Sequence, residues 1–170
     1  MEIRKLTSED AEDYRRLMLQ AFEKLPVVFV ESLQEGLDPA NSQLAVRIRD
    51  IGQADNQVFG AFSDAGELIG AVGVQQERLL KWRHKGVIFG MYVAQSHQGR
   101  GIGRKLLEAV LTGAGEMTGL EQLILVVGEQ TPGAQRLYES FRFRPFGVEP
   151  RELKVGDRYY RGIHMWLKLR

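Results

Sequence analysis

The chain has 170 residues, a formal net charge of +1 and no cysteine, and 44% of its residues are hydrophobic. This composition is typical of one globular domain that buries a full core, so residues 1–170 are predicted to form a single domain. The small net charge argues against nucleic acid or a membrane as partner. Without cysteine, disulfides, thiolate metal sites and cysteine nucleophiles are excluded. The chain shows no apolar signal core and no run of transmembrane length, so we expect a cytoplasmic protein.

The first third of the chain is predicted to contain one strand followed by helices. Residues 2–6 are typical of a short strand, and Thr7 and Asp10 fit a capping box that opens a helix. That helix ends before Pro26. Its buried face is formed by Ala11, Tyr14, Met18, Ala21 and Phe22.

The segment that follows, residues 27–40, has a less regular pattern. Its apolar start, residues 27–30, is expected to pack on the core, and residues 31–36 fit a short helix or a turn. Asn41 or Ser42 can then cap a further helix that continues through Ala45, Ile48 and Ile51.

The middle of the chain is predicted to form three strands. Residues 57–62 and 68–75 alternate as a hairpin around a turn at residues 64–66. The charged segment 76–85 is expected to be a solvated connection, with a contact to phosphate or acceptor as the alternative. Residues 86–93 are apolar on both faces, as in a strand that is covered on both sides.

The next segment is typical of a β-α-β unit. Apolar residues recur at helical spacing from Ile102, and this helix is expected to close at Gly119. Residues 122–127 form a continuous β-branched strand, which should lie parallel to strand 86–93. A ligand is expected beyond the carboxyl ends of these two strands.

The last part of the chain is predicted to add one helix and two strands. Thr131 is expected to be the N-cap of the helix and Pro132 its first residue. Strands are expected at 143–148 and 159–169, with a polar, turn-rich connection at 151–157. The order β-α-α-β-β-β-α-β-α-β-β predicts an α/β fold with a mixed-direction central sheet flanked by helices.

The run between the buried strand and its helix is rich in glycine and arginine. Gly99, Gly101 and Gly103 remove side chains from the turn, so a ligand can approach the backbone closely. The first N–H groups of the helix and its dipole attract anions, and Arg100 and Arg104 add positive charge. These features predict a phosphate-binding loop. Its spacing differs from the P-loop, which needs Lys and Ser or Thr after its last glycine, and from the G-x-G-x-x-G dinucleotide motif.

Two segments resemble the GNAT family of N-acetyltransferases. Gln98-x-x-Gly101-x-Gly103 is similar to its acetyl-CoA loop, and residues 134–143 are similar to its Ala-x-x-Leu-Tyr-x-x-x-Gly-Phe segment. The resemblance covers roughly residues 68–143. Two positions depart from the family pattern: Thr131 replaces an Asn that can reach the pantetheine arm, and Arg142 replaces a Gly, so the turn there is expected to be made differently.

The resemblance implies an acetyl-CoA-dependent N-acetyltransferase of GNAT-like fold. The acetyl group would pass directly to a primary amine of a small molecule or protein in a ternary complex, since no cysteine exists to carry it. Acetyl-CoA would be the co-substrate, and no metal is expected because the three histidines lack metal-ligand spacing. The implied contacts to acetyl-CoA are made by Tyr92, Val93, Gln98, Gly99, Arg100, Gly101, Ile102, Gly103, Arg104 and Thr131. The strand 86–93 should part from strand 122–127 near Tyr92, freeing backbone groups for the pantetheine amides.

The catalytic groups are less fully indicated. From its helical spacing alone Tyr138 is typical of a core aromatic residue, whereas the resemblance makes it the candidate general acid, with an ordinary pKa of about 10. Residues 87–93 contain no acid, so Glu77 or Glu129 is the tentative base, acting through water. Release of the proton to solvent without a dedicated base is the alternative.

Two other functions remain open from the sequence. The first is a non-catalytic acyl-CoA-binding module, and the second is a nucleotide-binding regulator that uses the glycine loop for another phosphate ligand. The acceptor would be defined by residues 27–36, 76–85 and 151–160, where the resemblance is thinnest. The oligomeric state is also open, a homodimer included.

Overall fold

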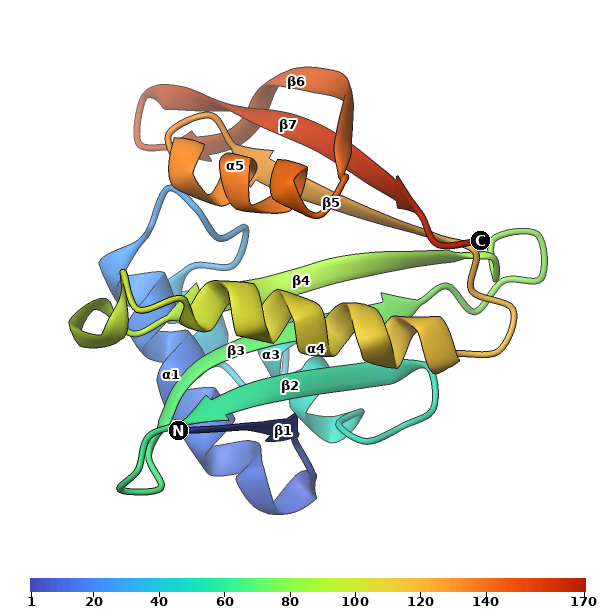
Figure 1. Ribbon diagram of the computed structural model, residues 1–170. Helices are drawn as coiled ribbons and strands as arrows, with labels where there is room; N and C mark the ends of the chain where they lie inside the picture. Colours follow the sequence, from blue (N-terminus) through green and yellow to red (C-terminus); the bar gives the residue numbers. More distant parts are fainter.

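Seven strands form one mixed sheet with helices on both of its faces (Figure 1). The computed structural model describes residues 1–170, and the strand order is β1-β2-β3-β4-β5-β7-β6. All neighbours are antiparallel except β4 and β5. The predicted α/β class with a sheet of mixed direction is therefore confirmed, as is the parallel pair. The strands are β1 (Glu2–Lys5), β2 (Asn56–Phe62), β3 (Leu68–Gln76), β4 (Lys85–Val93), β5 (Gln122–Gly128), β6 (Arg144–Val155) and β7 (Arg158–Lys168).

Five α-helices and two short 3-10 turns connect the strands. The α-helices are α1 (Ala11–Lys24), α2 (Leu33–Leu37), α3 (Gln43–Arg49), α4 (Ile102–Glu116) and α5 (Pro132–Ser140), and the 3-10 turns are η1 (Ser8–Asp10) and η2 (Gln95–His97). None of the helices combines the length and the hydropathy needed to span a bilayer.

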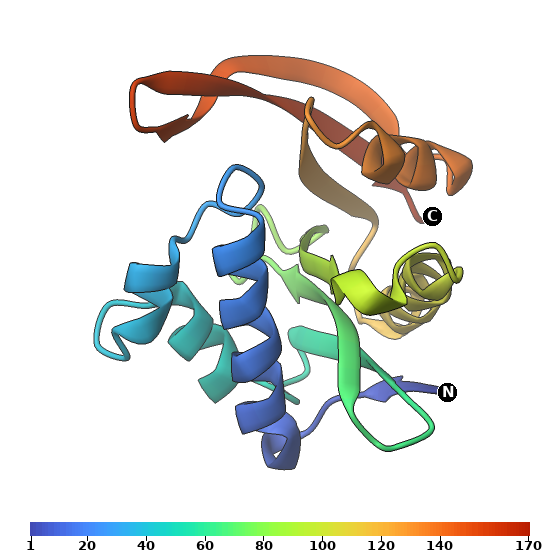
Figure 2. The same ribbon diagram turned by 90° about the vertical axis from the view of Figure 1, so that its left-hand side faces the viewer.

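The sheet separates two hydrophobic cores (Figure 2). One core packs α4 and α5 against one face through residues such as Leu106, Val110 and Tyr138. The other packs α1 and α3 against the opposite face through Tyr14, Leu44 and Phe89. Strand β4 contributes to both, because successive side chains of a strand point to opposite faces. We call these the α4/α5 face and the α1/α3 face.

The predicted capping box at the start of α1 is confirmed. The Asp10 carboxylate accepts hydrogen bonds from the Thr7 backbone N–H at 2.8 Å and from two Arg4 nitrogens at 2.6 and 2.8 Å. The Arg4 guanidinium, as the largest favourable influence, lowers the pKa of Asp10 to about 2. This cluster ties β1 to the start of α1, which covers the α1/α3 face.

Several predicted boundaries were wrong. For residues 31–36, expected to be a short helix or a turn, the structure has a helix, α2, because Ser32 and Glu35 form a capping box. Helix α4 ends at Glu116, before the expected end at Gly119. The expected connection 151–157 is mostly strand, since β6 continues to Val155. As the edge strand of the sheet, β6 is largely exposed, and its polar, proline-containing sequence therefore resembles that of a loop.

The turn after α5 also differs from expectation. Arg142 adopts φ 69°, the left-handed conformation that a glycine would take in the family pattern, so the turn is made in the ordinary way. The Phe143 N–H donates to the Tyr138 carbonyl at 3.2 Å and the Arg142 N–H donates to the Glu139 carbonyl at 2.9 Å, the two bonds of a Schellman motif. The Phe143 ring also packs edge-on against Tyr138, with centroids 5.8 Å apart. These contacts hold the arginine in a conformation that costs it about 1–2 kcal/mol.

Candidate functional site

Strands β4 and β5 pair over only a short length and then diverge. Only three residue pairs join them, from Lys85↔Gln122 to Val87↔Ile124. Beyond Val87 the β4 backbone has no partner on β5, so the strands separate as expected, but earlier along β4 than the expected position near Tyr92. A bulge in β4 accompanies this change, because β4 places one more residue than β3 between the paired positions Phe89 and Tyr92. Gly90, within it, has φ 62°, a conformation that glycine adopts without strain.

A cavity of about 510 Å³ occupies the gap between the two strands. Its lining is mostly hydrophobic and comes from both cores, so the gap joins the α4/α5 face to the α1/α3 face. The α4/α5 side contributes Tyr138 and Ala134 of α5, and the α1/α3 side contributes Tyr14, Phe22 and Arg47. A molecule that enters from one face can therefore meet a second molecule that enters from the other.

The glycine loop closes the α4/α5 side of this gap. The Gln98 side chain donates to the Val93 carbonyl at 2.9 Å, which ties the loop to the end of β4. Gly99 and Gly101 have φ 75° and 76°, and nothing lies within 4 Å of where their Cβ atoms would be. Gly101 is the N-cap of α4, and the first helical N–H bonded to it comes from Lys105. The N–H groups of Ile102, Gly103 and Arg104 are thus left for an anion.

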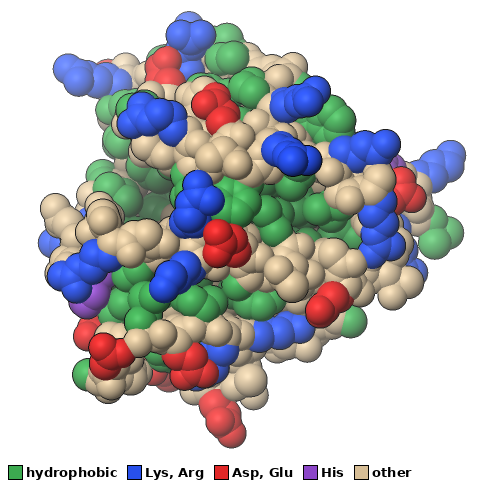
Figure 3. Space-filling model, in the orientation of Figure 1, with side chains coloured by type: hydrophobic (Ala, Val, Ile, Leu, Met, Phe, Trp, Pro, Cys, Tyr) green, Lys and Arg blue, Asp and Glu red, His purple; other side chains and the backbone are tan.

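Gly103 also has a packing role. A Cβ atom there would lie 3.4 Å from Leu137 Cδ2, an ordinary contact distance, so a larger side chain at this position would press on α5. Arg100 and Arg104 are exposed and donate to the Ser96 carbonyl and the Ser140 hydroxyl, each at 3.2 Å. Arg104 also lies 3.9 Å from a Glu108 carboxylate oxygen and over the Phe141 ring. In Figure 3, hydrophobic side chains gather in the hollow between α4 and α5, and basic side chains stand at its edge.

Two predicted site residues at the second edge of the gap line the cavity: Tyr138 of α5, and Thr131 just before that helix. Tyr138 is buried, and burial raises the pKa of its phenol, so the group is protonated at neutral pH. Thr131 occupies the N-cap position, but its hydroxyl donates to the Gly128 carbonyl at 2.8 Å instead of accepting from the helix. The threonine therefore closes the turn after β5, and the expected side-chain cap is absent.

The two glutamates predicted as bases lie outside the cavity. Glu77 follows β3 and lines a separate small hollow, and Glu129 forms an exposed ion pair with Arg161 at 3.3 Å. A third glutamate, which the sequence did not single out, does line the cavity: Glu152 of β6. Its side chain lies over Gly162 of β7, where a Cβ atom would be only 2.6 Å from Glu152 Cγ.

Glu152 belongs to a small cluster with Glu149 and His164. His164 Nε2 lies 3.3 Å from a carboxylate oxygen of Glu152 and 3.5 Å from one of Glu149. Burial, followed by the neighbouring Glu149, raises the pKa of Glu152, and His164 opposes this effect. His164 Nε2 and one carboxylate oxygen from each glutamate all lie within 4.8 Å of one another. No local pattern could have revealed this cluster, because Glu152 reaches it through the β6 bulge between Glu149 and Leu153.

Arg47 of α3 is the second lining residue that the sequence analysis missed. Its guanidinium carbon lies 3.8 Å from the centre of the Phe89 ring, and the side chain is half-buried. A signal was present, because Leu44, Arg47, Ile48 and Ile51 recur at i, i+3, i+4 and i+7. The arginine thus occupies one position of an otherwise apolar stripe.

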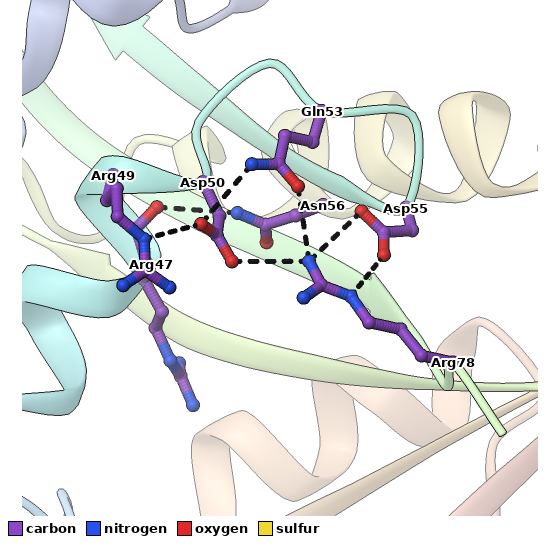
Figure 4. A network of polar contacts seen from close by, with 7 residues as sticks. All are labelled: Arg47, Arg49, Asp50, Gln53, Asp55, Asn56 and Arg78. Atoms are coloured by element: carbon purple, nitrogen blue, oxygen red, sulfur yellow. Dashed lines mark hydrogen bonds and ion pairs between the residues drawn. The ribbon is translucent and has the colours of Figure 1, made fainter.

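A polar network fixes the end of α3 (Figure 4). Asp50 is buried and accepts from Arg49 Nε at 3.0 Å, from Arg78 at 3.2 Å and from Gln53 at 3.3 Å. The side chain of Arg47 points away from this network, and only its backbone carbonyl takes part, accepting from Asn56 at 3.3 Å. The network therefore holds the helix while leaving the Arg47 guanidinium to the cavity.

Known proteins share this architecture. An acetyltransferase of the GNAT family from Streptococcus pneumoniae has a TM-score of 0.85 at 18% identity, with 98% of each chain covered. YncA, an acetyltransferase from Salmonella typhimurium solved with acetyl-CoA, has a TM-score of 0.84 at 22% identity, covering 100% of this chain and 94% of the other. A phosphinothricin acetyltransferase from Sinorhizobium meliloti in complex with acetyl-CoA has a TM-score of 0.83 at 19% identity, covering 98% and 87%.

At these identities the solved structures establish the fold, and the sequence itself establishes the family. No curated protein matches the chain. The model of the acetyltransferase (GNAT) family matches residues 13–143, which include the glycine loop, both diverging strands and α5. The chain is therefore an acetyltransferase and a member of the GNAT family.

Proposed function

We propose that the protein transfers an acetyl group from acetyl-CoA directly to a primary amine, with both substrates bound at once. The observation that carries this proposal is the cavity between β4 and β5, which is lined by residues from both faces of the sheet. A direct transfer needs donor and acceptor to meet in one space, and no cysteine exists to store the acetyl group.

The residues present fit acetyl-CoA as the donor. The free N–H groups of Ile102, Gly103 and Arg104 suit the pyrophosphate, and Arg100 and Arg104 can add their charge. The β4 backbone near Tyr92 and Val93, which lacks a strand partner, suits the amide groups of the pantetheine arm. Structures of family relatives with acetyl-CoA support this choice of donor.

Tyr138 is proposed as the general acid. When the amine attacks the thioester, a C–N bond forms, the C–S bond breaks, and the thiolate that leaves needs a proton. Tyr138 lines the cavity and holds its proton at neutral pH because burial raises its pKa. The same burial disfavours the phenolate, so the proton that Tyr138 gives up has to be replaced at once. The proton lost by the attacking amine goes to a base in the cavity and from there to solvent, and solvent in turn reprotonates Tyr138, which closes the balance.

Glu152 is proposed as the group that takes the proton from the amine. Unlike Glu77 and Glu129, it lines the cavity, and its raised pKa makes it a stronger base than an ordinary carboxylate. His164 beside it can pass the proton on, since its Nε2 lies 3.3 Å from Glu152. This assignment replaces the two glutamates that the sequence suggested.

A release assay for coenzyme A with a panel of primary amines tests the function. Turnover with any amine supports the transferase, and tight acetyl-CoA binding without turnover would instead support an acyl-CoA-binding module. For the base, Glu152→Gln should lower kcat by about 10- to 100-fold and remove the fall in rate at low pH. Glu149→Gln, its neighbour outside the cavity, is the matched control and should keep that fall. Equal loss in Glu77→Gln or Glu129→Gln would return the role to those residues.

A further inference from the structure

The cavity contains one arginine, Arg47, that forms no direct ion pair, although Glu31 and Glu35 also line the cavity. The Arg47 guanidinium makes no ion pair and donates no hydrogen bond to another side chain, and its contact is the Phe89 ring. Burial lowers its pKa below the usual value, yet an arginine stays charged. A cation that is partly withdrawn from water and left unpaired is costly, so it calls for an anion.

The arginines around Arg47 show that partners were available. Arg49, two residues further along α3, pairs with Asp50 at 3.0 Å, and Arg78 pairs with Asp55. The acid whose charge acts on Arg47 is Glu31, and its two oxygens are already used. One accepts from the Ser42 hydroxyl at 2.6 Å and the other from the Leu44 N–H at 2.9 Å, which caps α3. Glu31 therefore fixes the helix that carries Arg47 and attracts its charge from a distance, while the N–H donors of the guanidinium stay available.

Arg47 lies on the acceptor side of the gap. The glycine loop, α4 and α5, which would hold the donor, cover the α4/α5 face. Arg47 contacts Phe89, and Phe89 belongs to the core on the α1/α3 face. Tyr14 of α1 is near enough for the Arg47 charge to act on its phenol. A molecule that meets Arg47 therefore comes from the side opposite the proposed donor.

From this arrangement we infer that the acceptor is an amine that also carries a carboxylate, and that Arg47 binds this carboxylate. The inference rests on the proposed acetyltransferase function and specifies its substrate class. A guanidinium presents a planar fork of N–H donors that matches a carboxylate, and contact of its face with Phe89 leaves that fork free.

The other residues that line the cavity on the α1/α3 face indicate what the rest of the acceptor is like. The rings of Phe22 and Phe29 are tilted against each other with centroids 5.5 Å apart, and Phe29 meets Tyr92 edge-on at 6.3 Å, so the walls near Arg47 are aromatic. Such walls favour an apolar body. Apolar amino acids, with an amine, a carboxylate and a hydrocarbon side chain, are therefore the acceptors to test first.

Matched pairs of amines distinguish the effect of the carboxylate from the effects of the amine and the side chain. L-phenylalanine, L-leucine and L-methionine are compared with their amides, which keep the amine and the side chain but lose the negative charge. In the wild type we expect kcat/KM for at least one acid to exceed that of its amide by 10-fold or more. In Arg47→Gln this ratio should fall by about 10- to 100-fold, the size of a charge-assisted bidentate contact. The values for the amide should fall less than those for the acid, and the affinity for acetyl-CoA should be unchanged.

Arg49→Gln, on the same helix but outside the cavity, is the control and should keep the wild-type ratio. If Arg47→Gln lowers only Tm, or lowers acid and amide turnover equally, Arg47 is a packing residue and the inference fails. If amides are acetylated and none of the acids is, the inference also fails while the transferase function stands. If no amine is acetylated, the transferase proposal fails, and calorimetry then tests the carboxylate site separately. Binding of the amino acids that is lost in Arg47→Gln supports the carboxylate site. Absence of binding to the wild type overturns it.

Discussion

The two faces of the sheet contribute different kinds of chemical group to the cavity. On the α4/α5 face the proposed donor site consists largely of backbone: free N–H groups of α4, glycines with positive φ, and the unpaired edge of β4. On the α1/α3 face the proposed acceptor site consists of side chains such as Arg47 and Phe29. Backbone contacts suit a donor that stays the same across a family, whereas side chains can change with the acceptor.

This contrast predicts two classes of variant. Changes on the α4/α5 face should affect every amine equally, because they act on the donor or on the leaving thiolate. Changes on the α1/α3 face should alter the choice between amines and leave acetyl-CoA binding unchanged. A variant on the α4/α5 face that changes the choice of amine, or one on the α1/α3 face that changes acetyl-CoA binding, would contradict this division of roles.

The largest effect is expected for Tyr138→Phe. The ring and its packing on Phe143 remain, but the proton is lost, so kcat should fall by about 100-fold for every accepted amine. Stability and acetyl-CoA affinity should change little. Steady-state kinetics with two different amines check this, together with denaturation of Tyr138→Ala, which should cost about 3–5 kcal/mol. Full activity of the Phe variant would leave Tyr138 with packing alone.

The glycine loop comes next. Gly103→Val should weaken acetyl-CoA binding by about 1–3 kcal/mol, because a side chain there crowds the anion site and presses on Leu137. Gly115→Val is the control on the same helix, since nothing lies within 4 Å of its Cβ position. Calorimetry measures both variants after each has been shown to fold. Equal affinities for acetyl-CoA would place the anion site elsewhere.

A smaller, pH-dependent effect is expected at the start of α1. The pKa of Asp10 is about 2 in the folded protein, below the unfolded value of about 3.9, so its ionised form stabilises the fold. At pH 7, Asp10→Asn should lower the unfolding free energy by about 1–2 kcal/mol, allowing for solvent screening at Arg4. The difference should shrink as the pH falls from about 4 to about 2, since the carboxyl then protonates in both states.

Urea denaturation at several pH values measures this effect. Asp13→Asn, on the same helix, is the control, because Asp13 pairs only with the exposed Arg16. Since Asp10 supports the α1/α3 face, the variant should leave acetyl-CoA affinity unchanged. A difference that persisted undiminished at pH 2 would show that the charge of Asp10 is not its source.

The smallest effect is a gain. Arg142→Gly should raise the unfolding free energy by up to about 1 kcal/mol, because glycine adopts φ 69° without the strain that arginine bears. The entropy that glycine loses on folding offsets part of the benefit. Thermal denaturation measures the change, and Arg144→Gly, which lies in a strand, should instead destabilise the protein.

The donor half of the site could be predicted from sequence because its residues are contiguous. Gln98, Gly101 and Gly103 have a fixed spacing, and the strand before them and the helix after them are both strongly apolar. The separation of β4 from β5 was expected near Tyr92 from the family resemblance, and in the structure it begins already beyond Val87. Where strand and helix patterns were strong, the element types were correct.

The acceptor half could not be predicted in this way because it is assembled from distant segments. Glu152 and His164 meet only through the register of β6 against β7, and Arg47 reaches Phe89 from a separate helix. Because β6 is an edge strand with many polar residues, its sequence beyond Val148 resembles that of a loop. Arg142 was misjudged for another reason. It adopts a left-handed backbone conformation that is strained for arginine, and the hydrogen bonds of the turn and the contact between Tyr138 and Phe143 offset this strain.

The three-pair junction between β4 and β5 has a consequence for the protein without its donor. Each strand beyond the junction presents backbone groups that no neighbouring strand satisfies. Such free edges are the surfaces to which other extended chains add by β-augmentation. A donor bound between the strands would occupy these groups, so we expect the ligand-free protein to be the form that self-associates on storage or heating.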